Sequence, residues 1–517
     1  MKNAIIIGML LFTLSACSSF LEEYSQELAK VETITDLDEL LLGSAYLPVA
    51  KITTSSKYSV NLTSTQYITF INFMSDELRQ NELTNDGAYS GAFDGMFGYF
   101  TWQRNVGINP KGTAIGTENA YWKSTYQYIN VTNMIIDELD NVSITGEHEA
   151  ADRTRVEGEA HFLRALYYFN LINLYANPYK PSTAGETTGV PLKLTSYIED
   201  KTYTCSSVEE VYNQIVKDLK KAEECLEKST SKSIYRADIT AVYLLASRVY
   251  LYMQDYKNAR TYAQHVLDRN DALTDLNNFE GSESVFTSES PEVIFSMGGH
   301  MLYSYLNGNE VGVPQTPYFI SNDLLEAFDS PDDLRKSFYI EGSDNEYCYR
   351  KIVWGVSRWG QACSVSDNFL FRVSEAYLNL AEAAAFEGDE GEARRALGTL
   401  QAKRFSTAPV INESGNALID LIRCERQREL CLEGHRWFDL RRHAACEKYP
   451  SSKTYRHAYT EFELRIGDII PVRTRVYELE INDKAYTLAF PYEVLNFQSS
   501  LNKNNRIERE PIEYITY

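Results

Sequence analysis

Two glutamates and a histidine near residue 430 are the first candidates for chemistry. Glu429, Glu433 and His435 occur close together, and a carboxyl group near an imidazole can act as a general acid. Catalysis also needs a nucleophile or an orienting third group at a defined spacing, and the surrounding sequence supplies neither. The same stretch suits a helix whose charged side chains pair along one face. We therefore expect a structural role here and no enzymatic activity.

Aromatic residues among glycines form a second chemical feature, in the segments 95–105 and 351–361. Neither segment shows a helical period. An exposed aromatic ring buries the apolar face of a sugar without requiring hydrogen bonds, so such rings suit flat, hydroxylated ligands. Burial of the same rings beneath their own loops is the alternative. The candidate ligand-binding residues are Tyr99, Trp102, Trp354 and Trp359.

Polar and metal-binding candidates are few. Asp76, in the stretch MSDELRQNE, could contact ligand hydroxyl groups, although a solvated loop also explains it. Loop carboxylates can hold Ca²⁺, but no D-x-D-x-D-G pattern occurs, so a structural calcium ion has no support in the sequence. The eight cysteines contain no C-x-x-C pair and indicate neither a zinc site nor a disulfide framework. We expect no cofactor.

The thiol of Cys17 is placed for covalent modification. Residues 4–16, AIIIGMLLFTLSA, follow Lys2 and form about 20 Å of helix, shorter than the ~30 Å hydrocarbon core of a membrane. This length fits a secretory signal peptide, and LSAC resembles the lipobox of bacterial lipoproteins. We therefore predict cleavage after residue 16 and a diacylglycerol and acyl lipid anchor on Cys17. An ordinary signal peptide with a chance cysteine is the alternative.

The composition limits the partners. The chain of 517 residues has a formal net charge of −22, which disfavours a polyanion such as nucleic acid as ligand. It contains 37 tyrosines, a residue that buries its ring while its hydroxyl group stays solvated. These tyrosines fit either helix packing or a stacking surface for ligands.

Helical patterns dominate the chain. We expect a single, mainly α-helical domain over residues 17–517, with helices at about 30–50, 120–270 and 370–445. Two long segments, about 52–117 and 270–368, read as loops that lie over the helices. Short β-like pieces, such as AYTLAFPY, follow near the C-terminus.

Two helical pairs resemble each other and predict a tetratricopeptide-like scaffold of helical hairpins. When Asp255 is aligned with Asp389, small and aromatic residues coincide at several places. Small residues at these places allow two antiparallel helices to approach closely. The coinciding pairs are Tyr243 and Tyr377, Ala246 and Leu380, Ser247 and Ala381, Tyr250 and Ala384, and Ala259 and Ala393.

Several blocks resemble the RagB/SusD family of surface nutrient-binding lipoproteins of Bacteroidetes, and they occur in the order that the family shows. The sharpest is ERQRELCLEGHRWFDLRR, residues 425–442. Others are YWKSTYQYINVTNMII, EAHFLRALYYFNLINLYANPY, FRVSEAYLNLAEA and LAFPYEVLNFQSSLNKNN. In the last block Phe490-Pro491 replaces the usual I-P, and Lys503 precedes the asparagines.

The resemblance implies a lipoprotein of the outer membrane that faces the cell exterior. It would capture an oligosaccharide without cleaving it and pass it to a SusC-like TonB-dependent barrel. Glu22 and Glu23 resemble the acidic export signal of such proteins. Three alternatives remain at this point: a peptide-binding member of the same family, a tetratricopeptide-type scaffold for another protein, and a glycosidase.

Overall fold

A computed structural model describes most of the chain. Its residues are 31–47, 67–82, 90–116, 118, 120–197, 199, 202–230, 232–281, 284–299, 302–306, 316–344, 346–352, 364–466, 468–498, 501 and 506–517. Cys17, Trp354 and Trp359 lie outside these ranges. None of the helices within them combines the length and the apolar character of a membrane-spanning segment.

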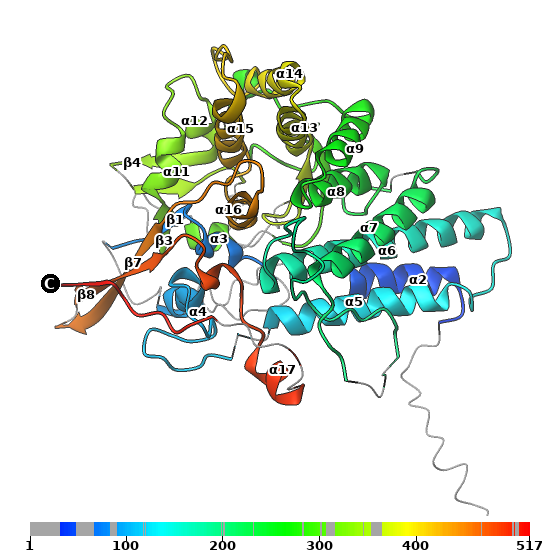
Figure 1. The fold of residues 1–517 in the computed structure, drawn as a ribbon, viewed down its shortest axis with the longest axis horizontal. Helices are drawn as coiled ribbons and strands as arrows, with labels where there is room; N and C mark the ends of the chain where they lie inside the picture. The colour runs from blue at the N-terminus through cyan, green and yellow to red at the C-terminus, as the bar shows by residue number, and fades with distance from the viewer. Residues whose placement is uncertain are drawn as a thin grey trace, which may run out of the picture.

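Helices packed side by side form the main scaffold of the molecule, as the predicted helical fold requires (Figure 1). Helix α5 packs on α6, α6 on α7, α7 on α8, α8 on α9, and α9 on α13, which also contacts α14 and α15. Helices α2 and α16 and the π-helical turn η1 complete this set. The bounds are α2 Ile34–Leu40, η1 Leu41–Ala45, α5 Ala120–Glu138, α6 Glu147–Tyr175, α7 Val208–Leu226, α8 Ile239–Tyr252, α9 Tyr256–Arg269, α13 Val373–Glu387, α14 Glu390–Gln401, α15 Gly415–Glu429 and α16 Arg436–Ala445.

The two similar helical pairs are the hairpins α8–α9 and α13–α14. In each hairpin the aligned aspartate, Asp255 or Asp389, caps the second helix by accepting a hydrogen bond from a backbone N–H. Ala259 is fully buried, and its carbonyl oxygen accepts a hydrogen bond of 2.9 Å from Ser247 Oγ. Helix α13 then packs directly on α9. The repeat in the sequence therefore marks one continuous helical stack.

Residues 52–117 and 270–368 contain short helices and strands in addition to loops, which differs from the prediction. Their elements are α3 Ile71–Met74, β1 Leu78–Gln80, α4 Ser90–Phe100, η3 Leu276–Asn278, β2 Val293–Ser296, α10 Tyr303–Leu306, β3 Tyr318–Ile320, α11 Asn322–Ala327, α12 Arg335–Tyr339, β4 Ile340–Ser343 and β5 Glu346–Tyr349. The pairs β1–β3, β4–β5 and β2–β6, with β6 at Leu370–Arg372, are antiparallel. The pair β1–β3 joins the two segments to each other, and β2–β6 joins the second segment to the strand that leads into α13.

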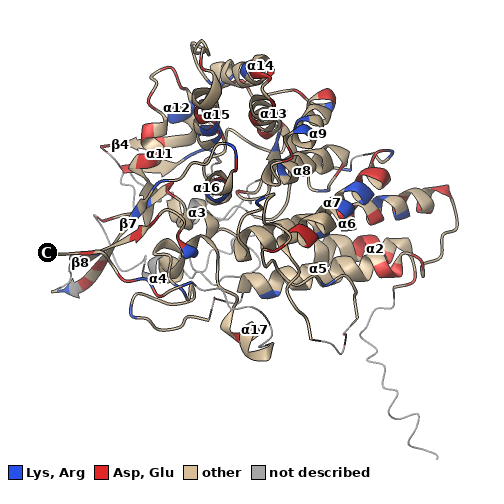
Figure 2. Cartoon of the chain, in the orientation of Figure 1, with Lys and Arg blue, Asp and Glu red and all other residues tan. Residues whose placement is uncertain are grey.

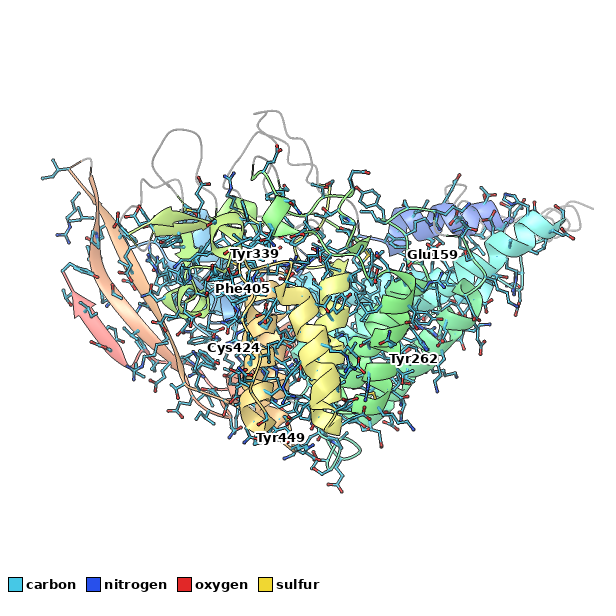
Figure 3. All side chains as sticks on the ribbon, turned by 90° about the horizontal axis from the view of Figure 1, so that it is seen from above. Glu159, Tyr262, Tyr339, Phe405, Cys424 and Tyr449 are labelled. Carbon is cyan, nitrogen blue, oxygen red and sulfur yellow. The ribbon has the colours of Figure 1, made fainter. Side chains whose placement is uncertain are left out.

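A three-stranded antiparallel sheet forms the C-terminal part, in the order β7-β8-β9. The stretch AYTLAFPY contributes no strand to it, because a short 3-10 helix lies there instead. The elements are β7 Tyr455–Arg465, β8 Asp468–Leu479, η4 Lys484–Tyr486, α17 Tyr492–Phe497 and β9 Glu513–Thr516. In the view from above, the interior residues Tyr339 and Phe405 lie between this sheet and the helices α8 and α9 (Figure 3).

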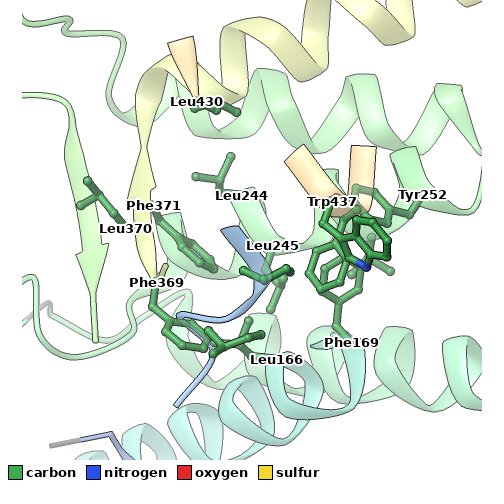
Figure 4. Close-up of a cluster of buried hydrophobic side chains, with 14 of the residues drawn as sticks. Leu166, Phe169, Leu244, Leu245, Tyr252, Phe369, Leu370, Phe371, Leu430 and Trp437 are labelled. Atoms are coloured by element: carbon green, nitrogen blue, oxygen red, sulfur yellow. The ribbon is translucent and has the colours of Figure 1, made fainter. Parts of the chain in front are cut away.

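The core joins segments that are far apart in the sequence. Figure 4 shows Phe169 of α6, Leu245 of α8, Phe371 of β6 and Trp437 of α16 in one buried cluster. Burial of each large apolar side chain contributes about 1.5–3 kcal/mol, so such a cluster favours one arrangement of the whole chain.

Candidate ligand-binding face

Tyr99 and Trp102 lie in the core, which contradicts their predicted place on a ligand-facing loop. Trp102 has 0% of its surface exposed and Tyr99 has 2%. The indole Nε1 of Trp102 donates a hydrogen bond of 2.8 Å to the carbonyl oxygen of Met74, and its ring stacks on His457 at 4.3 Å between centroids. Tyr99 stacks on Phe70 at 4.3 Å. Because both faces of these rings are covered by protein, neither ring is available to a ligand.

Asp76 is also buried, and it is an ion-pair partner instead of a ligand contact. Its two carboxylate oxygens each lie 2.7 Å from a guanidinium nitrogen of Arg436. Burial alone would raise the pKa of Asp76, but the charge of Arg436 lowers it below the usual value. This pair fastens residues 67–82 to the start of α16.

The neighbouring carboxyl group of Glu77 is in the opposite protonation state. Burial raises the pKa of Glu77 to about 8, and the charge of Asp76 adds to this effect. A carboxyl oxygen of Glu77 accepts a hydrogen bond of 3.2 Å from the backbone N–H of Leu432. Since the Glu77 carboxyl group is buried and bonded to the backbone at Leu432, it also belongs to the structural framework.

A buried network of arginines and carboxylates ties the 270–368 segment to the helices. Three guanidinium groups converge on the carboxylate of Glu429: Arg404 Nε at 2.8 Å, Arg372 Nη1 at 2.9 Å and Arg335 Nη1 at 3.2 Å. Each of these four side chains has 0% of its surface exposed. Lys351 joins the network through Glu433, its ion-pair partner.

The charges in this network stabilise one another in their ionised forms. Burial would raise the pKa of Glu429, but the charges of Arg404 and Arg372 hold it well below its usual value. Breaking a buried ion pair typically costs several kcal/mol, because it leaves an uncompensated charge away from water. The network therefore fixes Lys351, two residues before the segment 353–363 that carries Trp354 and Trp359.

Described residues that border three of the undescribed segments meet at one place. The ring of Tyr67 lies 6.0 Å from that of Phe369, and Ser366 Oγ donates a hydrogen bond of 3.1 Å to the carbonyl oxygen of Gly299. Leu47 lies beside Gly298, the residue before Gly299. Residues that border the segments 48–66, 300–301 and 353–363 therefore lie together around residues 364–369.

One exposed aromatic residue lies at this meeting place, and the sequence analysis missed it. Tyr235 is 41% exposed, and its hydroxyl group donates a hydrogen bond of 2.8 Å to the carbonyl oxygen of Ser364. The backbone N–H of Val285 donates a hydrogen bond to the carbonyl oxygen of Lys351, and that of Ser288 donates one to Ser364 Oγ. Residues 285–288 therefore contact the chain on both sides of the segment 353–363, and Tyr235 contacts it at Ser364. We call the surface around Tyr235 and Ser364 the insertion face. Tyr235 precedes α8 in a short polar connection, and no glycine-rich pattern singled it out.

The part of the chain that the structure describes contains no metal-binding site. No group of three or more His, Cys, Asp or Glu side chains is arranged there to hold a metal ion. The described cysteines are free thiols.

Comparison with known proteins gives two matching family models. A model described as starch-binding and associating with the outer membrane matches residues 20–251, and the SusD family model matches residues 334–506. The starch-binding protein SusD of Bacteroides thetaiotaomicron is 23% identical over 434 residues, which span 66% of this chain and 73% of that protein.

Solved structures share the fold over nearly the whole chain. A SusD superfamily protein of Bacteroides thetaiotaomicron superposes with a TM-score of 0.66 at 20% identity, and the match covers 92% of this chain and 100% of that one. A laminarin-binding SusD-like protein superposes with a TM-score of 0.60 at 20% identity and the same coverage. The helical stack, the signature block at 425–442 and the two family models agree, and the chain belongs to the SusD/RagB family.

Proposed function

We propose that this protein is a lipid-anchored glycan-binding protein on the outer face of the outer membrane. It captures an oligosaccharide and passes it, without cleaving it, to a SusC-like TonB-dependent barrel. Family membership is the observation that carries this proposal, since one relative binds starch and a structural neighbour binds laminarin. The predicted lipid on Cys17 supplies the anchor.

The insertion face is the proposed glycan site. Tyr235 presents part of its ring to solvent, and its hydrogen bond to Ser364 fixes the ring in place. Trp354 and Trp359 belong to the segment 353–363, which is followed in the chain by Ser364, the hydrogen-bond partner of Tyr235. Aromatic rings at such a surface bury the apolar faces of sugar rings, and repeated weak contacts along a polymer add up through avidity.

Calorimetric titration of the purified mature protein with a panel of polysaccharides, including starch and laminarin, tests the proposal. We expect at least one glycan to bind, and Tyr235→Ala to weaken that binding about tenfold or more. Tyr492→Ala removes a tyrosine that is 68% exposed on α17, and it should leave the affinity unchanged.

Two results would contradict the proposal. The first is binding to peptide mixtures with no response to any glycan, which would favour the peptide-binding alternative. The second is the release of shortened products from a bound glycan, which would indicate an enzyme. Co-purification of the tagged protein with an outer-membrane barrel tests the transfer step separately.

A further inference from the structure

A second concave surface lies between α5, α6 and α7 and is separate from the residues of the insertion face. Its volume is about 760 Å³, within the usual range for small-molecule sites. The segment after α6 closes one side of it through Leu194. We call this surface the α6–α7 groove.

The floor of the α6–α7 groove holds a carboxylate that is already neutralised. Asp218 Oδ1 lies 2.6 Å from Arg164 Nη2 and 2.7 Å from His161 Nδ1. Arg164 Nη1 donates a further hydrogen bond of 2.9 Å to Asn133 Oδ1. Asp218 has 1% of its side chain exposed, so its charge is compensated within the protein and does not repel an anion in the groove.

The rim of the groove is basic, although the whole chain is strongly acidic. Four lysine and arginine side chains and two carboxylates line the groove, which gives a local formal charge of +2 in a chain of −22. Lys221 is paired with Glu157 at 3.0 Å. Lys217 and Lys220 point to no carboxylate within ion-pair distance among the residues that the structure describes. Figure 2 shows basic residues on α7, whereas α2 carries acidic ones.

Part of the groove wall is apolar. Ile136 of α5, Val216 of α7 and Leu194 line it beside the charged groups, and Leu194 is 37% exposed. Asn213 and Gln214 add uncharged groups that can bind hydroxyls. The groove thus combines free cations, hydroxyl-binding amides and an apolar part of the wall on one surface.

We propose that the α6–α7 groove binds a sugar residue that carries a carboxylate or sulfate group. Lys217 and Lys220 contact the anionic group, and Leu194 and Ile136 pack on the sugar ring. This site is independent of the glycan site proposed above, because the two share no residue. Tight binding needs both the charged group and the sugar ring. An inorganic anion would contact only the two lysines, and a neutral sugar would contact only the apolar part of the wall.

Ligand-observed NMR titration of the mature protein with D-glucuronate, D-glucose and inorganic sulfate tests the site at low ionic strength. We expect glucuronate to bind at least tenfold more tightly than glucose or sulfate. The double variant Lys217→Gln, Lys220→Gln should lose at least tenfold in affinity for glucuronate. Leu194→Asp places a carboxylate on an exposed part of the wall and should cause a similar loss. Lys257→Gln, an exposed lysine on α9, is the matched control and should bind as the unchanged protein does.

Three results would overturn this inference: equal affinity for glucuronate and glucose, equal affinity for glucuronate and sulfate, or glucuronate binding that survives both the double variant and Leu194→Asp. The double variant should also keep its affinity for the polysaccharide identified above. If no polysaccharide binds while glucuronate binding still depends on the two lysines, the groove stands and the proposed capture function fails.

Discussion

At the scale of single residues, the indole of Trp102 is a structural group. His457 lies between the rings of Phe100 and Trp102, with centroid distances of 4.2 and 4.3 Å, and its Nδ1 bonds to the carbonyl oxygen of Phe100 at 2.6 Å. Burial lowers the pKa of His457 to about 4, so the imidazole is neutral at physiological pH. The stack therefore joins α4 to β7 without a buried charge.

Trp102→Ala should destabilise the protein by about 3–5 kcal/mol, because it removes a fully buried ring and leaves a cavity. Urea denaturation followed by circular dichroism measures the loss. In the absence of urea, the folded variant should bind glycan as tightly as the unchanged protein does. Lost affinity with unchanged stability would contradict the structural role and restore Trp102 as a ligand contact.

Glu77 should make stability depend on pH. The folded protein keeps this proton up to about pH 8, whereas the unfolded chain releases it near pH 4.5. Since the folded state binds more protons in this window, its free energy of unfolding decreases as the pH rises from about 4.5 to 8. Glu77→Gln removes this contribution, at about 1.4 kcal/mol for each unit of pKa difference.

The measurement is denaturant unfolding of both proteins at pH 5 and pH 8. The variant should gain stability relative to the unchanged protein between these two pH values, by on the order of a few kcal/mol. Glu186→Gln changes an exposed carboxylate on a turn and serves as the control. A constant difference between the proteins at both pH values would show that Glu77 is already ionised at pH 5.

The position of the stacking residues could not be predicted from the sequence because glycine has two uses. In the segment 95–105 the glycines suggested a loop. The structure shows that Gly98 belongs to α4, where a Cβ atom would lie 2.3 Å from the carbonyl oxygen of Val106. The glycine thus permits close packing of a buried turn. No glycine-rich pattern surrounds Tyr235 in the sequence, so its exposed side chain could be recognised only in the folded structure.

At the scale of elements, the buried network around Glu429 connects α15 with α12, β6 and the end of α14. Sequence analysis placed Glu429 in a charged helix, and helix spacing correctly indicated pairing. It suggested partners along the same helix, but the closest partners, Arg372 and Arg404, come from other elements. Pairing between distant segments leaves no period in the sequence.

Glu429→Gln should destabilise the protein by about 3–5 kcal/mol, because three buried guanidinium groups lose a shared carboxylate. Chemical denaturation measures the change. In the control, Glu463→Gln breaks an exposed pair with Arg465 on β7 and should change stability by less than about 0.5 kcal/mol. Equal effects of the two substitutions would argue against a stabilising network.

Element prediction succeeded for the helices of the stack and failed for the short helices of the two long segments and for the long strands. The helical hairpins were predicted because small residues and capping aspartates repeat at fixed spacing. Strand β7 also carries a signal, since Tyr455, His457 and Tyr459 are buried while Arg456 between them is exposed. The prediction missed this alternation because four charged residues interrupt the eleven-residue stretch, and it read the stretch as a polar tail.

At the scale of the whole molecule, the predicted lipid decides where the protein acts. Cys17→Ala removes the thiol that would carry the diacylglycerol, so the protein should move from the membrane fraction to the soluble fraction of lysed cells. Ser19→Ala is the control and should leave the protein in the membrane fraction. Immunoblotting of the two fractions measures the distribution. If Cys17→Ala stayed in the membrane fraction, the result would contradict a lipid anchor on Cys17.

The contact between α9 and α13 has a consequence for how proteins of this architecture diversify. The two helices touch although residues 270–372 separate them in the chain. The entropy lost on closing such an excursion grows only logarithmically with its length, by about 0.6 kcal/mol for each doubling. Evolution can therefore lengthen, shorten or replace the excursion at little thermodynamic cost, provided that Arg335, Lys351 and Arg372 still reach their carboxylates. One helical frame can in this way acquire new cargo preferences while its own folding stays nearly unchanged.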